Sequence, residues 1–425
     1  MSQLPEIVSR AEVVVDLDAI ADNVATLRRR VRTGSPHTLM MTVVKADGYG
    51  HGLVEAARAA RAGGADWLGV AVLEEGLALR AAGDTGPVLS WLTVPGEDLA
   101  PAVQAGVDLT AYTCGELDEV VAAARSTGRP ARVQLKADTG LGRGGALPDA
   151  WPGLVEHAAA AERSGAVRVT GVWSHFACSD EPDHPANADQ ERLFARALEA
   201  AEEAGLRPEV RHLSNSAGAL LRPWAGYDLV RCGIASYGLS PAPGVVTSAD
   251  LGLVPAMTAR ARLAMVKRLP AGSGVSYGHT WTAERDTTVA LVPVGYGDGL
   301  HRLASSRAQV LAAGARRPVV GRICMDQLVV ALDDAVARPG DPVVLFGSGE
   351  DGEPTAQDWA EACETISYEV VTGIGGRFRR RHVSRRGLAD PTGTDQERGT
   401  AGQVTATGTA TATADTTATT GRGAW

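Results

Sequence analysis

Residues 39–72 read LMMTVVKADGYGHGLVEAARAARAGGADWLGVAV and contain the unit from which most of the chain is built. An apolar run at Met40–Val44 leads into an Ala-, Glu- and Arg-rich segment, and a second apolar run follows at Trp67–Val72. The apolar runs predict strands and the segment between them predicts a helix. Neither run alternates apolar with polar residues, which is typical of parallel strands buried on both faces.

The same strand–helix unit repeats as far as about Gly238. Its eight strand-like runs are Met40–Val44, Trp67–Val72, Pro87–Trp91, Asp108–Tyr112, Arg132–Lys136, Val167–Trp173, Glu209–Leu213 and Leu229–Arg231. Eight such repeats predict an α/β fold of the (β/α)8 TIM-barrel type. We place this barrel domain at residues 11–240, after a short N-terminal lead at residues 1–10.

One strand-like run, Glu12–Leu17, precedes the first barrel strand. A helix is predicted directly after it, with Asp18 as its N-cap, because apolar residues recur there at helical spacing: Ile20, Val24, Leu27 and Val31. Since the barrel already has eight strands, we expect the leading strand to pair with the second domain.

The pattern of the sequence changes after residue 240, where helical stretches become few. Short runs separated by Gly- and Pro-bearing turns predict a mostly β domain at residues 241–385: Thr258–Val266, Thr288–Val292, Pro318–Val320, Leu328–Leu332 and Pro342–Leu345. Residues 386–425 become Thr-, Ala- and Gly-rich and hold too little apolar surface to offset the entropy of ordering. We therefore expect a disordered tail there.

Composition excludes several classes of protein. With 425 residues, the chain exceeds the roughly 250–300 residues at which chains usually divide into domains. The net charge of −9 argues against nucleic acid or an anionic membrane as the main partner. The first ten residues lack the features of a secretory signal, and no run approaches the ~20 apolar residues of a membrane helix.

The five cysteines are scattered, odd in number and never spaced as CxxC: Cys114, Cys178, Cys232, Cys324 and Cys363. This pattern predicts reduced thiols in a cytoplasmic protein, with neither a disulfide framework nor a metal site.

Polar residues fall where the predicted barrel strands end. They are Lys45 after the first strand, Lys136 at the end of the fifth with Arg143 in the glycine-rich loop beyond, His175 after the sixth, Asn215 and Ser216 after the seventh, and Arg231 with Gly233 at the eighth. Because catalytic groups of such barrels gather at the C-terminal ends of the strands, these residues predict an active site. A lysine that leaves a buried strand is desolvated, which favours the neutral, nucleophilic amine. The alternative for Lys45 alone is a surface lysine at a strand end.

Several segments resemble the motifs of bacterial alanine racemases, in the same order. They are VVKADGYGHG (43–52), KADTGLGRGG (136–145), SHFACSDEP (174–182), HLSNSAGAL (212–220), VRCGIASYGLSP (230–241), GVSYGHTW (274–281), PVGYGDG (293–299) and GRICMDQ (321–327). The resemblance spans roughly Ala11 to Arg380. It implies a barrel that binds pyridoxal 5′-phosphate (PLP), followed by a β domain.

By this resemblance, Lys45 holds PLP covalently, and the other cofactor-binding residues are Tyr49, His175, Asn215, Ser216, Arg231, Gly233 and Ile234. The residues themselves support a phosphate site. Small residues open a helix at Ser216, where free N–H groups favour an anion, and Gly233 permits close approach of the backbone. Taken alone, this signal is weak.

Arg231 indicates the type of reaction. The resemblance places it against the pyridine nitrogen of PLP. Arginine donates a hydrogen bond but does not readily give up its proton, so the ring stays a poor electron sink and reprotonation is favoured over transamination. His212 is positioned to hold Arg231. The alternative is a structural ion pair at the barrel rim.

Racemisation requires a base on each face of a planar intermediate. Lys45 supplies one, and the resemblance implies that Tyr277 of the other subunit of a homodimer supplies the second. A tyrosine phenol in water has a pKa of about 10, so a neighbour must assist, and His175, linked to Arg231, is implied. Without the motif, Tyr277 is an ordinary turn aromatic.

The resemblance also implies that Arg143, Met325 and Lys136 bind the substrate, the last as a lysine that is carbamylated in some family members. Tyr296 and Asp326 match residues at the substrate entrance. Gly376 falls where the family often has a tyrosine that touches the phosphate. The basic run Arg377, Arg379, Arg380 and Arg381 is expected to form a solvated face.

These observations predict an enzyme that interconverts L- and D-alanine and supplies D-alanine for peptidoglycan. A racemase for another amino acid, such as serine, is the first alternative. A PLP-dependent decarboxylase would favour an acidic partner for the ring nitrogen, which Arg231 opposes. A non-catalytic PLP carrier of the single-barrel type would lack the β domain.

Overall fold

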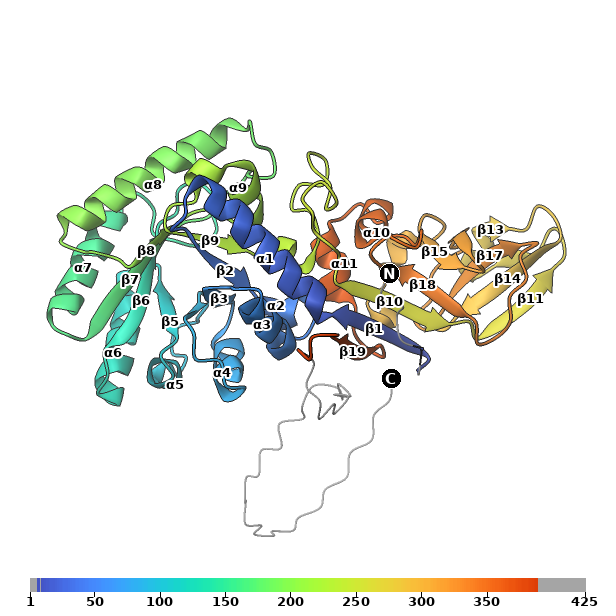
Figure 1. Ribbon diagram of the computed structural model, residues 1–425, viewed down its shortest axis with the longest axis horizontal. Helices are drawn as coiled ribbons and strands as arrows, with labels where there is room; N and C mark the ends of the chain where they lie inside the picture. The colour runs from blue at the N-terminus through green and yellow to red at the C-terminus, as the bar shows by residue number, and fades with distance from the viewer. Residues whose placement is uncertain (1–5, 8, 389–425) are drawn as a thin grey trace, which may run out of the picture. The chain divides into compact units, whose positions relative to one another are not determined.

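The computed structural model describes residues 6, 7 and 9–388 (Figure 1). The expected disordered tail lies outside the described residues from position 389 onward, as do residues 1–5 and 8 of the N-terminal lead. No helix within the described ranges is long and apolar enough to cross a membrane.

Eight parallel strands form the predicted barrel. They are β2 (Leu39–Val43), β3 (Trp67–Val70), β4 (Val88–Ser90), β5 (Asp108–Ala111), β6 (Ala131–Lys136), β7 (Val167–Trp173), β8 (Val210–His212) and β9 (Leu229–Cys232). Each lies within or overlaps one predicted run, and the sheet order is β8-β7-β6-β5-β4-β3-β2-β9. Backbone bonds from Asp228 N to Arg211 O and from Arg231 N to Ser214 O link the two end strands, so the ring is nearly closed. The predicted barrel fold is confirmed.

Helices connect the barrel strands and cover their outer side (Figure 1). They are α1 (Leu17–Gly34), α2 (Lys45–Tyr49), α3 (Leu53–Ala62), α4 (Leu73–Ala81), α5 (Ala100–Gln104), α6 (Cys114–Thr127), α7 (Trp151–Arg163), α8 (Pro185–Glu203) and α9 (Ser216–Leu221). The predicted N-cap of α1 was wrong. Asp16 caps it, accepting from Asp18 N and Ala19 N, while the Asp18 carboxylate accepts from Ser384 and Arg385.

The remaining strands form three antiparallel or mixed sheets. The largest has the order β16-β15-β18-β10-β1-β19, and the smaller ones are β11-β14-β17 and β12-β13. Their bounds are β1 (Ala11–Asp16), β10 (Met257–Arg262), β11 (Met265–Leu269), β12 (Gly274–Val275), β13 (Trp281–Thr282), β14 (Thr287–Val292), β15 (Gln309–Ala312), β16 (Ala315–Pro318), β17 (Leu328–Asp333), β18 (Pro342–Phe346) and β19 (Arg379–Val383). Two further helices, α10 (Ala356–Ala362) and α11 (Ser367–Gly373), follow β18. The N-terminal strand β1 lies between β10, antiparallel to it, and β19, parallel to it.

Two strand predictions in this region were wrong. The run 258–266 is two strands in different sheets, because the chain leaves β10 at Leu263 and enters β11 after Ala264. The run 318–320 ends a strand instead of forming one: β16 stops at Pro318 and pairs with β15 through a turn at Ala313 and Gly314, both with positive φ.

The expectation of a solvated basic run holds for Arg377, which is exposed, but is wrong for the arginines that follow it. Arg379, Arg380 and Arg381 belong to β19 and are half-buried. Arg380 Nη1 donates to Asp47 Oδ2 at 2.5 Å, and Arg377 bonds to the buried carboxylate of Asp298. A guanidinium that reaches a buried carboxylate exchanges hydration for directed, charge-assisted hydrogen bonds, which a count of charges along the sequence does not reveal.

Candidate active site

Four basic side chains share the carboxyl rim of the barrel: Lys45, Lys136, His175 and Arg231. Burial lowers the pKa of each, and the positive charge of Arg143, on the exposed loop after β6, lowers all four further. The structure therefore brings together the residues expected at the strand ends. The cations of this cluster, Lys45, Lys136, Arg143 and Arg231, repel one another, and such a cation cluster fits a site for anions.

Lys45 opens a turn with an unusual backbone. The four residues after it all have left-handed φ: Ala46 (52°), Asp47 (55°), Gly48 (62°) and Tyr49 (52°). Only glycine adopts this region without cost, so the surrounding structure must hold the turn. Glu75 Oε1 accepts from Ala46 N at 2.7 Å, and Asp47 Oδ1 accepts from Leu53 N at 2.9 Å.

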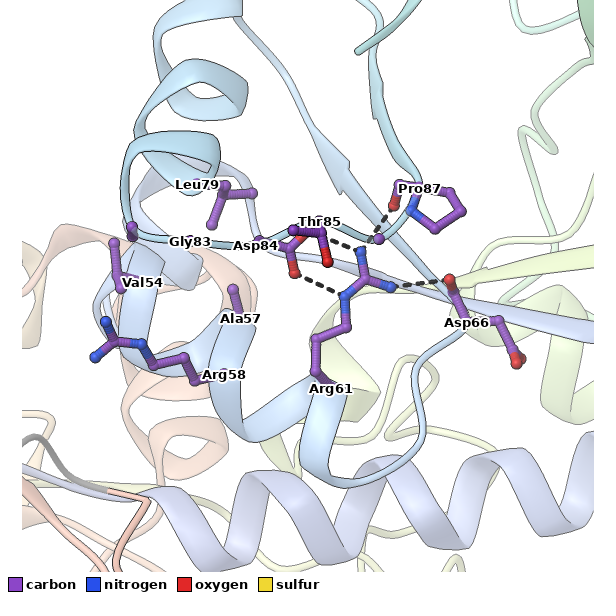
Figure 2. Close-up of a pocket in the computed structure, with 12 residues that line it drawn as sticks. Val54, Ala57, Arg58, Arg61, Asp66, Leu79, Gly83, Asp84, Thr85 and Pro87 are labelled. Atoms are coloured by element: carbon purple, nitrogen blue, oxygen red, sulfur yellow. Dashed lines mark hydrogen bonds and ion pairs between the residues drawn. The ribbon is translucent and has the colours of Figure 1, made fainter. Parts of the chain in front are cut away.

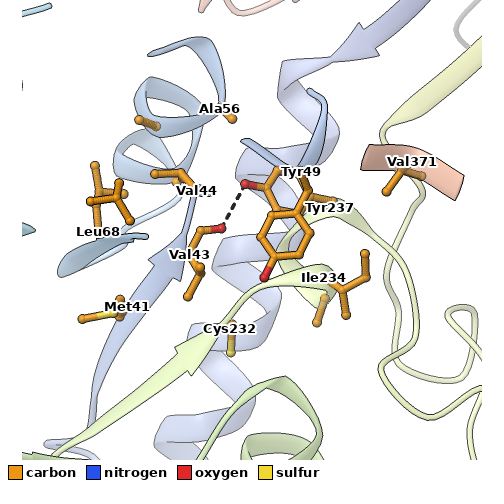
Figure 3. Packing of buried hydrophobic residues seen from close by; sticks show 14 of the residues in the cluster. Met41, Val43, Val44, Tyr49, Ala56, Leu68, Cys232, Ile234, Tyr237 and Val371 are labelled. Atoms are coloured by element: carbon orange, nitrogen blue, oxygen red, sulfur yellow. Dashed lines mark hydrogen bonds between the residues drawn. The ribbon is translucent and has the colours of Figure 1, made fainter. Parts of the chain in front are cut away.

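Tyr49, Ser216 and Gly233 meet at the end of β9. The Tyr49 hydroxyl lies so close to Gly233 that a Cβ there would come within 2.3 Å of it. Ser216 Oγ accepts from Gly233 N at 2.9 Å. Ile234 is buried beside Tyr49 (Figure 3). Asn215 caps α9, with its Oδ1 accepting from Gly218 N and from Ser179 Oγ.

Arg231 is buried among neutral acceptors. Its Nη1 donates to His212 Nδ1 at 2.9 Å, and its Nη2 bonds to His175 Nδ1 at 3.0 Å and to the carbonyls of Ser174 and Leu213. Burial lowers the pKa of the guanidinium to about 9 and holds the pKa of both histidines well below its usual value. Within the described chain these bonds leave the Nε hydrogen and one of the two Nη1 hydrogens for a group in the site. The predicted link from His212 to Arg231 is confirmed.

Aromatic rings that sequence reasoning missed surround the amines. Trp173 packs under Lys136 Nζ, 4.6 Å from the ring centroid, and under the Arg231 guanidinium at 5.0 Å. Tyr112 and Trp91 contact Lys136 and Lys45 in the same way. Such cation–π contacts stabilise buried charges. The available signal was the position of each aromatic residue at the carboxyl end of a predicted strand.

The other predicted site residues lie together on the β region. Ser276, next to Tyr277, donates to Arg322 O, and the backbone of Tyr296 bonds to Cys324 O. Arg377 joins Asp298 to Asp326, which follows Met325. Tyr277 is 71% exposed and Met325 is 55% exposed.

No hydrogen bond or ion pair within the described residues joins these side chains to the barrel group. The predicted site thus consists of two clusters in one chain, one at the barrel rim and one on the β region. The second presents exposed aromatic and apolar side chains.

Comparisons with known proteins identify the family. The profile described as "Alanine racemase, N-terminal domain" matches residues 15–241, and "Alanine racemase, C-terminal domain" matches residues 256–382. The alanine racemase of Salinispora arenicola is 56% identical over 366 residues, which are 86% of this chain and 96% of that protein. The chain belongs to the alanine racemase family. It is therefore an isomerase that interconverts L- and D-alanine.

Solved structures of the alanine racemase family have the same fold. The enzyme from D-cycloserine-producing Streptomyces lavendulae matches with a TM-score of 0.87 at 52% identity, over 89% of this chain and 98% of that one. The alanine racemase of Streptomyces coelicolor A3(2) matches with a TM-score of 0.86 at 52% identity, over 88% and 98%.

Gly376 departs from the pattern that the alanine racemase family often shows, and the structure gives the reason. Its φ is +57°, and a Cβ there would lie 2.7 Å from Gly297 O, so the position has no room for a side chain. The Tyr368 ring instead lies 6.2 Å from that of Tyr49. Burial raises the pKa of both phenols, which favours their neutral, hydrogen-donating forms.

Among the cavities formed by the described residues, two lie near the barrel strands, and one of these two adjoins the candidate site. A cavity of about 520 Å³ lies at the amino ends of the strands (Figure 2), where Arg61 already bonds to Asp84 and to three backbone carbonyls. These bonds engage every nitrogen of the Arg61 guanidinium, so Arg61 has no free donor for a ligand in this cavity. A cavity of about 410 Å³ includes Asn215 and Tyr368 in its lining and adjoins the barrel rim.

Proposed function

We propose that this chain racemises alanine with PLP held by Lys45, in a homodimer in which each active site receives Tyr277 from the partner chain. The cation cluster at the barrel rim carries the proposal. It suits a phosphate and a substrate carboxylate together, and the close packing of Tyr49 against Gly233 supports a tight phosphate cup with Ser216, Asn215 and Ile234.

When bound, PLP withdraws electrons from the α-carbon of the amino acid attached to it and so acidifies the proton on that carbon. Lys45 handles this proton on one face. Its pKa is lowered by burial and by Arg143, against the opposing charge of Glu75, so its amine is readily available in the neutral form that accepts a proton.

We assign Arg231 Nε to the pyridine nitrogen because Nε makes no hydrogen bond to a described residue, whereas Nη1 and Nη2 are both held by the protein. A guanidinium donates without transferring its proton, which keeps electron withdrawal by the ring modest and favours return of a proton to the α-carbon.

Tyr277 of the partner chain acts on the opposite face. His175 Nδ1 accepts from Arg231, so its hydrogen sits on Nε2, which can donate to the phenol oxygen and stabilise it after it loses its proton. Arg143 and the backbone N–H of the partner chain's Met325 bind the substrate carboxylate. Lys136, where it is carbamylated, becomes an anion that orients Arg143.

The first test is Lys45→Ala, which should abolish both cofactor absorbance and racemisation. The sequence holds three lysines, Lys45, Lys136 and Lys267, so borohydride reduction followed by peptide mapping identifies the modified one directly. Lys267 is exposed on β11, and Lys267→Ala is the matched control that should keep both properties. Label on Lys136, or normal turnover by Lys45→Ala, would contradict the proposal.

We further propose that the product serves peptidoglycan synthesis in the cytoplasm. All five cysteines are free, as reduced thiols are in that compartment. The gene should restore growth of a bacterium that requires external D-alanine, and a Lys45→Ala copy should not. Turnover of serine at the rate of alanine would instead favour a racemase of broader specificity.

A further inference from the structure

The interior of the barrel holds a column of polar side chains below Arg231. Such interiors are normally filled by branched apolar residues. Here Asp108, Gln134, Thr170 and His212 are all fully buried. Burying polar groups is costly unless each is hydrogen-bonded, so the column requires a specific network.

Every hydrogen bond of this network is donated in the same direction, from Arg231 towards Asp108. Arg231 can only donate, so His212 Nδ1 accepts and the imidazole hydrogen lies on Nε2. His212 Nε2 then donates to Gln134 Oε1 at 2.7 Å. Gln134 Nε2 donates to Asp108 Oδ2 at 3.2 Å, so three donors in series end on a carboxylate.

The local backbone is shaped to admit this network. The pairing of β6 with β7 shifts register between Val133 and Gln134, so Thr170 is the extra residue of a β-bulge. Thr170 Oγ1 donates to Asp108 Oδ2. A Cβ on the next residue, Gly171, would lie 2.6 Å from Gln134 Oε1, so glycine leaves the space that the amide needs.

The far end of the series is fixed by an ion pair. Arg132 Nε donates to Asp108 Oδ1 at 2.6 Å. The other oxygen, Oδ2, accepts from Gln134 and Thr170 and has a longer contact of 3.4 Å to Arg132 Nη2. Burial raises the pKa of Asp108 above its ordinary value, and the hydrogen bonds from Arg132, Thr170 and Gln134 oppose this rise only in part.

Arg231 makes no ion pair with any described residue, although a buried guanidinium favours an anionic partner. The nearest link to a carboxylate through hydrogen bonds is this series. We propose that Gln134 and Asp108 are positioning residues for the racemase, forming a relay that fixes the tautomer of His212 and thereby the orientation and donor strength of Arg231. The proposal rests on the role assigned to Arg231 above.

Asp108→Asn is the sharpest test. Arg132 keeps the Asn carbonyl facing itself, so the new amide hydrogens face Gln134. Gln134 must then turn over and offer hydrogens to His212 Nε2, which conflicts with the donation from Arg231 at Nδ1. We expect His212 to change or mix tautomers. We also expect PLP to dissociate roughly tenfold faster, an effect of the size seen when the outer partners of metal ligands are removed.

A double variant tests whether the direction of hydrogen-bond donation in the relay matters, separately from any loss of packing. When Asp108→Asn is combined with Gln134→Glu, the Asn amide donates to the introduced carboxylate, which also accepts from His212 Nε2, so the relay again runs towards a carboxylate. This variant should restore both the tautomer and the slow release of PLP. Thr110→Val, buried on the same strand and outside the relay, is the control.

The readouts are solid-state ¹⁵N spectra of histidine-labelled protein, assigned with a His212→Gln variant, and the decay of cofactor absorbance after dilution. An unchanged His212 tautomer in Asp108→Asn, or a double variant no better than the single one, overturns the proposal. Failure of the proposed function can be distinguished from failure of the relay. If the proposed function is wrong, no variant shows cofactor absorbance, but the ¹⁵N spectra still report the tautomer of His212.

Discussion

Lys136 is a buried cation whose charge the protein tolerates poorly. Burial, and then the charges of Arg231 and Arg143, lower its pKa to about 8. In an unfolded chain the pKa of lysine is about 10.4. Between these values the unfolded chain binds more protons than the folded one, so stability rises with pH across this window, and below about pH 8 the full penalty applies.

Lys136→Met should therefore stabilise the cofactor-free protein at pH 7, and the gain should shrink as the pH rises from 8 towards 10. Urea unfolding at several pH values measures this. The cofactor-free form is required because bound anions would offset the charge. Lys267→Met, on an exposed strand, should give no such trend, and a gain for Lys136→Met that is independent of pH would contradict the explanation.

The strand β19 holds the turn that presents Lys45. Arg380 bonds to Asp47, and His382 Nε2 donates to His51 O at 2.7 Å. His51 Nδ1 in turn donates to the carbonyls of Gly48 and Tyr49. A left-handed turn of non-glycine residues costs energy, and these contacts from a distant strand supply the compensation.

Arg380→Met should destabilise the protein by about 1–3 kcal/mol, between the values for exposed and for fully buried ion pairs. Amide hydrogens of the Lys45 turn, such as those of Gly48 and Gly50, should exchange faster. Arg381→Met is the control on the same strand, since Arg381 bonds to Glu6 O instead. Equal exchange rates in the two variants would show that the ion pair does not hold the turn.

The elements differ in how well the sequence predicts them. Barrel strands are buried on both faces, so each appears in the sequence as a continuous apolar run that is readily recognised as a strand. In the β region, β10 and β11 are separated by two residues, Leu263 and Ala264, and no composition change marks the crossing between sheets. The relay was missed because its members lie far apart in sequence, although Gln134 within a buried strand was a visible signal.

At the scale of the whole molecule, the chain divides its site residues between two clusters. The motif order located both, because each motif is contiguous. In the proposed homodimer their assembly into one site depends on a second chain, which a single sequence cannot display. Tyr277, exposed beside Met325, supports the proposal that a partner completes the site.

Mixing two inactive variants tests this sharing of sites. Lys45→Ala and Tyr277→Phe chains, unfolded and refolded together in equal amounts, should regain about a quarter of wild-type activity, because half of the dimers are mixed and one of their two sites is intact. Each variant refolded alone should show almost no activity when it is expressed, like the mixture, as a fraction of wild-type activity. No recovery in the mixture, with dimers present by light scattering, would place both residues in the same chain's site.

The bond between Asp47 and Arg380 spans 333 positions of the chain. A ribosome that has finished the last barrel strand has yet to make the arginine that secures the lysine turn. Folding of the barrel can begin during synthesis, since domains generally fold as they emerge. We expect the proposed cofactor, by contrast, to be held well only once β19 has been made, so that a chain cut short before β19 would bind it poorly.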